Sequence, residues 1–207
     1  MNVGGSVRHA LDELDRGNVD AAMLHACNAV DGTAKKVLPG LGSNRRFTQL
    51  LRDNYCILGP MGAPGINVQE TRFPVSVPRP TSPGGEPDFA DVIYGIHRCS
   101  HGHGDELPDG FELMPDAGGP LRRTHMSLTR EGGMRVSDRV IFGLLAVAVL
   151  NPVNKDQSAP PGYYLTYGAQ RMLLEEWWGR ARDFPKILAA EPELPCVKLD
   201  FSNWKRT

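Results

Sequence analysis

The sequence predicts a mainly α-helical protein, an up-and-down bundle of five to six helices with a small β-hairpin insertion. Apolar residues recur at helical spacing in several segments that short turns connect, which favours antiparallel helices packed side by side. The apolar run 140–150 is too short to span a bilayer and is typical of a buried core helix. Residues 109–136 differ, because short alternating runs separated by turn residues are typical of hairpin strands.

The first half of the chain predicts three helices. Residues 6–16 place apolar side chains on one face, and Asn18 is a favourable N-cap for an alanine-rich helix over 19–38. Small alanine side chains would allow a second helix to approach closely. Ser43 is expected to cap a third helix over residues 44–58.

The second half begins with a loop at 59–87 that is too rich in Pro and Gly for regular structure, apart from a short strand at 71–77. Helical spacing returns at Asp88 and runs into the His-Gly segment that ends near residue 104. After the β insertion, Ser137 and Asp138 should cap the helix that ends at Leu150. A last helix is expected at 166–183, and residues 185–207 form an extended tail. All 207 residues are assigned to one domain.

Composition limits the classes of function. The formal net charge is −1, so any nucleic-acid site must be a local basic patch. The four cysteines are scattered, with no C-x-x-C pair, and the N-terminus shows no apolar leader segment. We therefore expect a cytoplasmic protein with reduced thiols and no membrane partner.

Residues 97–106 hold the densest collection of reactive side chains, including three of the six histidines. Arg98 can hold a phosphate through two parallel hydrogen bonds, and His103 can exchange a proton near neutral pH. Five residues apart on a continuous helix, the two would point about 140° apart. Gly102 and Gly104 favour a helix end near Gly102, which would let His103 turn back toward Arg98. Such a pair could cleave RNA by internal attack of the ribose 2′-OH without a metal.

Two other interpretations of this segment stay open. His97 and His101 are spaced i,i+4 and could bind Zn or Ni with His103 or Asp105, although no second ligand cluster is evident. Alternatively, the His-Gly stretch is an ordinary helix C-terminus, and Arg98 simply pairs with Glu106 or Asp105.

At these residues the sequence resembles the HEPN superfamily of helical bundles, whose nuclease members carry Arg-x4–6-His at the end of a late helix. Arg98 and His103 match that motif with a spacing of four. The upstream stretch ALDELDRGNVDAAMLHACNAVDGTAKKV is similar to the first helix pair of the family. The resemblance covers roughly residues 6–150, with 59–87 as an insertion.

The resemblance implies a metal-independent endoribonuclease without a cofactor, a homodimer with its two motifs facing each other, that acts as a toxin or in phage defence. Arg98 would stabilise the scissile phosphate and His103 would be the acid–base group. Cys99 stands where active members commonly carry Asn, Asp or His. His101 or Asp105 would then supply the supporting polar group, with His97 beside them. The implied partners are RNA and an antitoxin or regulatory protein.

Two basic groups could contact RNA phosphates. Arg122 and Arg123 begin a basic strip in the β insertion, for which cross-strand charge pairing is the competing interpretation. Arg45 and Arg46 form a second basic group on the third helix, where a merely solvated face is the alternative. Two further functions remain open, a non-catalytic HEPN-like nucleotide- or protein-binding module and a metal-dependent hydrolase.

Overall fold

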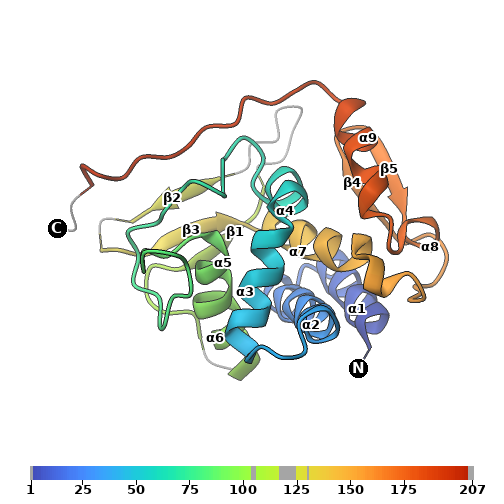
Figure 1. Ribbon diagram of the computed structural model, residues 1–207, viewed down its shortest axis with the longest axis horizontal. Helices are drawn as coiled ribbons and strands as arrows, with labels where there is room; N and C mark the ends of the chain where they lie inside the picture. Colours follow the sequence, from blue (N-terminus) through green and yellow to red (C-terminus); the bar gives the residue numbers. More distant parts are fainter. Residues whose placement is uncertain (1, 104–105, 117–124, 130, 205–207) are drawn as a thin grey trace.

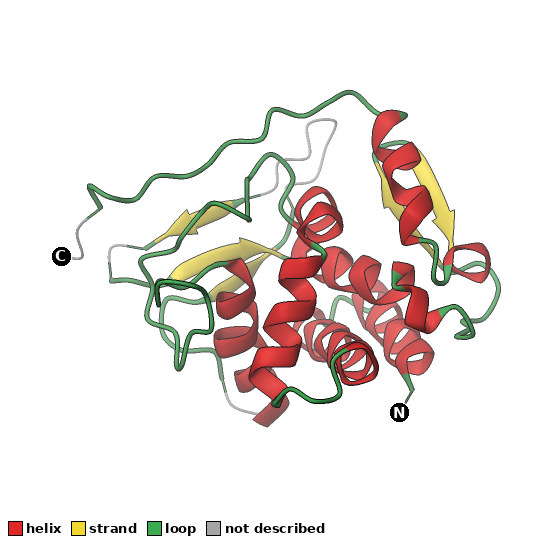
Figure 2. Cartoon of the chain, viewed as in Figure 1, coloured by secondary structure: helices red, strands yellow, loops and turns green. Residues whose placement is uncertain are grey.

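The computed structural model describes residues 2–103, 106–116, 125–129 and 131–204, and the side chain of His103 lies outside that description. The prediction of a mainly helical protein is confirmed, but the strands exceed a single hairpin: they form a three-stranded sheet and a separate two-stranded one. Figures 1 and 2 show the helices grouped centrally, with the larger sheet beside α5 and the smaller one near α8 and α9.

The core is built on three helices, α1 (Val3–Asp15), α2 (Val19–Val37) and α7 (Arg139–Leu150). A three-residue turn joins α1 to α2, and the two pack together as the sequence predicted. Within α7, every residue except Arg139 and Phe142 is buried. The apolar run is therefore a central core helix rather than an amphipathic surface helix.

The third predicted helix is in fact two, α3 (Ser43–Asp53) and α4 (Tyr55–Gly62), separated at Asn54. Gly42, not Ser43, occupies the N-cap position of α3. The break lets α4 cross α7 closely, because Gly62 and Gly143 present no side chains there. A Cβ built on Gly143 would lie 2.9 Å from the Gly62 Cα. Glycines at this crossing bring the two helix backbones into contact.

The Pro/Gly-rich segment after α4 contains no strand at 71–77, contrary to the prediction, but it is firmly attached to the helices. Arg52 of α3 donates to Asp88 at 2.7 Å and forms a 3.0 Å ion pair with Asp91. Asp91 also accepts from the backbone N–H and hydroxyl of Thr81. These side chains are nearly buried, so a charged network holds the loop where a hydrogen-bonded strand was expected.

One continuous helix carries the segment with the three histidines. It begins as α5 (Phe89–Val92), passes through a π-helical stretch (Ile93–Arg98) and ends as α6 (Cys99–His103). The helix therefore continues through Gly102, one residue beyond the predicted end. Asp88 caps its start by accepting from the Asp91 N–H at 3.0 Å.

The β insertion forms β1 (Glu112–Met114), β2 (Met126–Leu128) and β3 (Met134–Ser137), in the spatial order β1-β3-β2. The predicted strand positions are confirmed, but β1 pairs with β3 in parallel, so the insertion is not a simple hairpin. The hydroxyl of Ser137 accepts from the Arg139 N–H at 3.1 Å and so caps α7, as predicted. Asp138 stands at the N-cap position without a side-chain cap.

The predicted helix over 166–183 is wrong. The chain forms a hairpin of β4 (Tyr164–Tyr167) and β5 (Gln170–Leu173), followed by short α8 (Leu174–Trp177) and, after a 3-10 turn, α9 (Phe184–Ala189). Gly168 makes the turn with a φ of +55°, a conformation that favours glycine. Pro185 lies in the first turn of α9 rather than closing a helix.

The prediction of an extended tail over 185–207 is wrong for residues 185–189, which belong to α9, and beyond them the described chain is extended. It runs back over the molecule (Figure 1), and a parallel bridge joins Val197 to Ile66. The Val197 N–H donates to the Gly65 carbonyl at 2.9 Å, and its own carbonyl accepts from the Asn67 N–H at 2.9 Å. None of the helices in the described ranges has the length and apolar character needed to cross a bilayer.

Candidate functional site

The candidate site is centred on Arg98, which closes the π-helical stretch. Short π segments inside α-helices are often found at functional sites. Gly95 allows this helix to meet the Pro/Gly loop, since a Cβ on Gly95 would lie 2.4 Å from Cγ1 of Val77. The side chain of Arg98 is 25% exposed, so its guanidinium can still be reached from solvent.

Arg98 is held by Asp31 of α2 at an Nη2–Oδ2 distance of 2.7 Å. Among the described residues the acidic partner of Arg98 is therefore Asp31 of α2 rather than Glu106, while Asp105, the other partner considered, lies outside them. Arg46 of α3 approaches the other oxygen of the same carboxylate at 3.5 Å. We call these three residues, Asp31, Arg46 and Arg98, the Asp31 cluster. Because two arginines share one carboxylate, the cluster has a local excess of one positive charge.

Two further contacts orient the Arg98 side chain. Its guanidinium carbon lies 5.6 Å from the ring centroid of Tyr94, within the range of a cation–π contact. The side chain also passes beside Gly102, where a Cβ would stand 3.4 Å from Nη1. Burial disfavours the charged form, but the hydrogen bond to Asp31 outweighs this and raises the pKa of Arg98. The guanidinium is therefore fixed in place and charged at any physiological pH.

His97 points away from solvent. The residue is 1% exposed, and neither ring nitrogen has a hydrogen-bond partner among the described residues. Burial lowers the pKa of His97 to about 3, with His101 adding to the effect, so the imidazole is neutral at pH 7. A ring so enclosed cannot exchange protons with a bound RNA, and His97 is better described as a core residue next to the site.

His101 lies one turn further on, with its ring stacked near that of His97 at a centroid distance of 6.1 Å. Its Nε2 is 4.0 Å from Asp20 of α2. Burial lowers the pKa of His101, and Asp20 partly opposes the shift. The two rings are thus close, but in the described part of the chain no three His, Cys, Asp or Glu side chains form a group able to hold a metal ion.

Cys99 is half-buried, and burial raises the pKa of its thiol although Arg98 opposes the shift. It is therefore a neutral thiol at pH 7 and only a weak hydrogen-bonding neighbour for Arg98. The side chain of His103 and the whole of Asp105 lie outside the described residues, as do Arg122 and Arg123.

The two basic groups separate in the structure. Arg46 joins the Asp31 cluster, whereas its neighbour Arg45 is exposed. In the β insertion, Arg135 stands opposite Glu112 on the paired strand, and their side chains form a 2.9 Å ion pair. This pair is an instance of the cross-strand charge pairing considered from the sequence.

Asp31 is the residue that the sequence analysis missed. The sequence gives one weak indication of its role, because Asp31 is a carboxylate between buried Val30 and Thr33 in an alanine-rich helix. Which arginine it would meet depends on how α2, α3 and the π-helical stretch pack together, because Arg98 lies 67 positions further along the chain.

Comparison with known proteins places the whole chain in one group. Residues 2–205 match the Rv1289 family. The chain belongs to that family. It is 42% identical over 205 residues to the uncharacterized proteins Rv1289 of Mycobacterium tuberculosis and Mb1320 of Mycobacterium bovis, covering 98% of this chain and 95% of each relative. No solved structure matches this member of the Rv1289 family.

Proposed function

We propose that this member of the Rv1289 family is a metal-independent endoribonuclease of the HEPN type, with Arg98 and His103 as its reactive pair. The observation that carries the proposal is the Asp31 cluster: a charged, partly exposed guanidinium is fixed near the end of a helix, with a second arginine beside it. A preorganised cation of this kind suits the transition state of phosphoryl transfer, in which negative charge spreads over the phosphate oxygens.

The reaction would proceed by internal attack. The ribose 2′-oxygen forms a bond to phosphorus as its proton passes to the His103 imidazole, and the bond to the 5′-oxygen of the next nucleotide breaks. The leaving oxygen takes up a proton from solvent and the protonated His103 releases its own to solvent, which leaves a 2′,3′-cyclic phosphate and a 5′-hydroxyl. Arg98 and Arg46 bind the non-bridging oxygens, while Asp31 keeps Arg98 in place. A homodimer would bring two such sites to a shared groove, under control of an antitoxin or regulatory protein.

Incubation of the purified protein with a mixed RNA in EDTA tests the proposal. We expect fragments that end in a 2′,3′-cyclic phosphate. The rate of cleavage should fall by at least about a hundredfold in Arg98→Ala and in His103→Ala. Arg182→Ala is the matched control, because this exposed arginine lies in the 3-10 turn just before α9. Figure 1 shows α9 and α6 on opposite sides of the molecule. Cleavage that needs a divalent metal, or that survives both substitutions, would contradict the mechanism.

A second candidate function is a non-catalytic module that binds nucleotides or a protein partner. It is favoured by the direct hydrogen bond between Arg98 and Asp31, because a phosphate would have to share the guanidinium with a carboxylate. Wild-type protein that binds RNA or dimerises but cleaves no RNA substrate would support this function over the first.

A further inference from the structure

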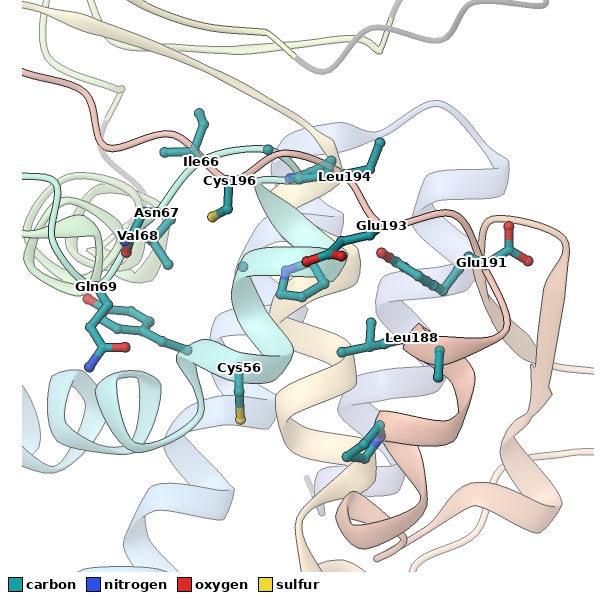
Figure 3. A pocket seen from close by; sticks show the side chains of 18 residues that line it. Cys56, Ile66, Asn67, Val68, Gln69, Leu188, Glu191, Glu193, Leu194 and Cys196 are labelled. Atoms are coloured by element: carbon teal, nitrogen blue, oxygen red, sulfur yellow. The ribbon is translucent and has the colours of Figure 1, made fainter.

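A cavity elsewhere in the molecule shares no lining residue with the Asp31 cluster. Its volume is about 730 Å³, within the range of small-molecule sites, and α4, the following loop, α9 and the extended tail enclose it. Figure 3 shows the tail crossing the mouth of this cavity, with Glu193, Leu194 and Cys196 on that side. We call it the tail cavity.

The walls of the tail cavity are largely apolar. Proline and aliphatic side chains line much of it, with Leu188 of α9 on one side. Leu194 of the tail is 53% exposed, although large aliphatic residues are usually more buried. Two main-chain hydrogen bonds at Val197 hold the tail in this position, so the wall is part of the fold. An apolar ligand body would cover Leu194.

The charged side chains of the cavity are all acidic. Glu191 and Glu193 line it, and no Lys, Arg or His is among its described lining residues. Glu191 is already engaged at one oxygen, which accepts from the Ala169 N–H at 2.9 Å and from Gln170 at 3.1 Å. Glu193 is exposed and reaches over the mouth of the cavity (Figure 3). The ring of Tyr167 adds an aromatic surface of the kind that attracts cations.

From this combination we propose that the tail cavity binds a small organic ammonium compound, with its apolar body against Leu188 and Leu194 and its charge facing Glu193. Anions are disfavoured because both glutamates would repel them, and neutral compounds lack the charge attraction. The site is independent of the proposed ribonuclease activity.

Two exposed cysteines provide a direct measurement. Cys56 and Cys196 both line the cavity, whereas Cys27 is buried and Cys99 is half-buried in the other site. The rate at which iodoacetamide modifies each thiol, followed by mass spectrometry of the peptides, reports whether the cavity is occupied. The probes are hexylammonium, 1-hexanol and hexanoate at millimolar concentration, which share an apolar chain and differ in charge.

Hexylammonium should slow modification of Cys56 and Cys196 by about threefold at about twice its Kd, while Cys99 keeps its rate. Glu193→Gln should raise the Kd measured from this protection about two- to fivefold with no change in Tm, because Glu193 is exposed. Glu175→Gln, an exposed glutamate outside the cavity, is the control and should leave it intact. The proposal would be overturned if hexanol or hexanoate protected the two thiols as well as hexylammonium does. Protection that Glu193→Gln leaves unchanged, or no protection by any of the three probes, would also overturn it.

Discussion

Arg98 and Asp31 are joined by a 2.7 Å hydrogen bond between helices that lie far apart in sequence, and the Asp31 carboxylate is only 15% exposed. The same carboxylate faces Arg46 at 3.5 Å. Without it, two half-buried guanidinium groups would be left facing each other. The stability of this region therefore depends on Asp31 more than on either arginine.

We predict that Asp31→Asn lowers the free energy of unfolding by about 2–3 kcal/mol, because it leaves a partly buried pair of like charges uncompensated. Urea unfolding measures the change. Glu112→Gln is the control, since its 2.9 Å ion pair with Arg135 is about half exposed on both sides and should be worth less than about 1 kcal/mol. A double-mutant cycle with Arg98→Met that shows no coupling between the two positions would contradict the assignment.

His97 makes a prediction about pH. Its pKa is about 3 in the folded protein and about 6.5 in the unfolded chain, so the unfolded state binds more protons between these values. The stability associated with a neutral His97 is complete above pH 6.5 and is lost as the pH falls toward 3, by up to about 1.4 kcal/mol per pH unit. In His97→Phe the free energy of unfolding should depend less on pH in this range. At pH 5 the substitution should leave that free energy unchanged or increase it.

His125→Phe is the control for that experiment, because His125 is exposed and should leave the pH profile unchanged. An acid-side slope identical in wild type and His97→Phe would show that His97 is not the group responsible.

Arg52→Met should destabilise the protein by about 3–5 kcal/mol, since it strands the nearly buried carboxylates of Asp88 and Asp91. The Pro/Gly loop loses the same anchor, so limited proteolysis should cut faster within residues 72–87. Arg45, an exposed arginine on the same helix, gives the comparison. The free energy of unfolding of Arg45→Met should stay within about 0.5 kcal/mol of the wild-type value. Equal effects of the two substitutions would argue against a structural role for the network.

The crossing of α4 and α7 can be tested with a single methyl group. In Gly143→Ala the new Cβ would stand 2.9 Å from the Gly62 Cα, so the helices must separate, at a cost of about 1–3 kcal/mol. Thermal unfolding measures this. Gly40→Ala adds a methyl group with nothing within 4 Å and should change Tm little. If Gly143→Ala raised Tm, the close approach described here would be incorrect.

The sequence predicted those parts of the fold that depend on local patterns. Helical periodicity and terminal residues located α1, α2 and α7, and alternation with turn residues located the strands of the β insertion. The failure at 166–183 was also local. Leu165 and Met172 are buried as paired strand residues. The helix was predicted because Met172, Leu173, Trp177 and Ala181 recur at helical spacing, although Gly168 forms a turn between two strands.

Only part of the candidate site could be predicted from local sequence patterns. The segment around Arg98 was evident because reactive residues cluster in it, but Asp31 joins it through packing of separate helices, which no local pattern encodes. Likewise, the break of the expected third helix at Asn54 accompanies the packing of α4 against α7, which is a contact between separate segments. The tail cavity depends on a contact between residues 65 and 197, and neither segment suggests it by itself.

The bridge between Ile66 and Val197 also has a consequence for how the protein is made. During synthesis the helices up to α7 can begin to assemble once residue 150 has left the exit tunnel of the ribosome, since most of their contacts are with one another. Residues 65–67 must wait until the segment around Val197 has been translated and has left the exit tunnel. A nascent chain stalled after α7 would thus carry a formed Asp31 cluster but an open, unwalled face where the tail belongs.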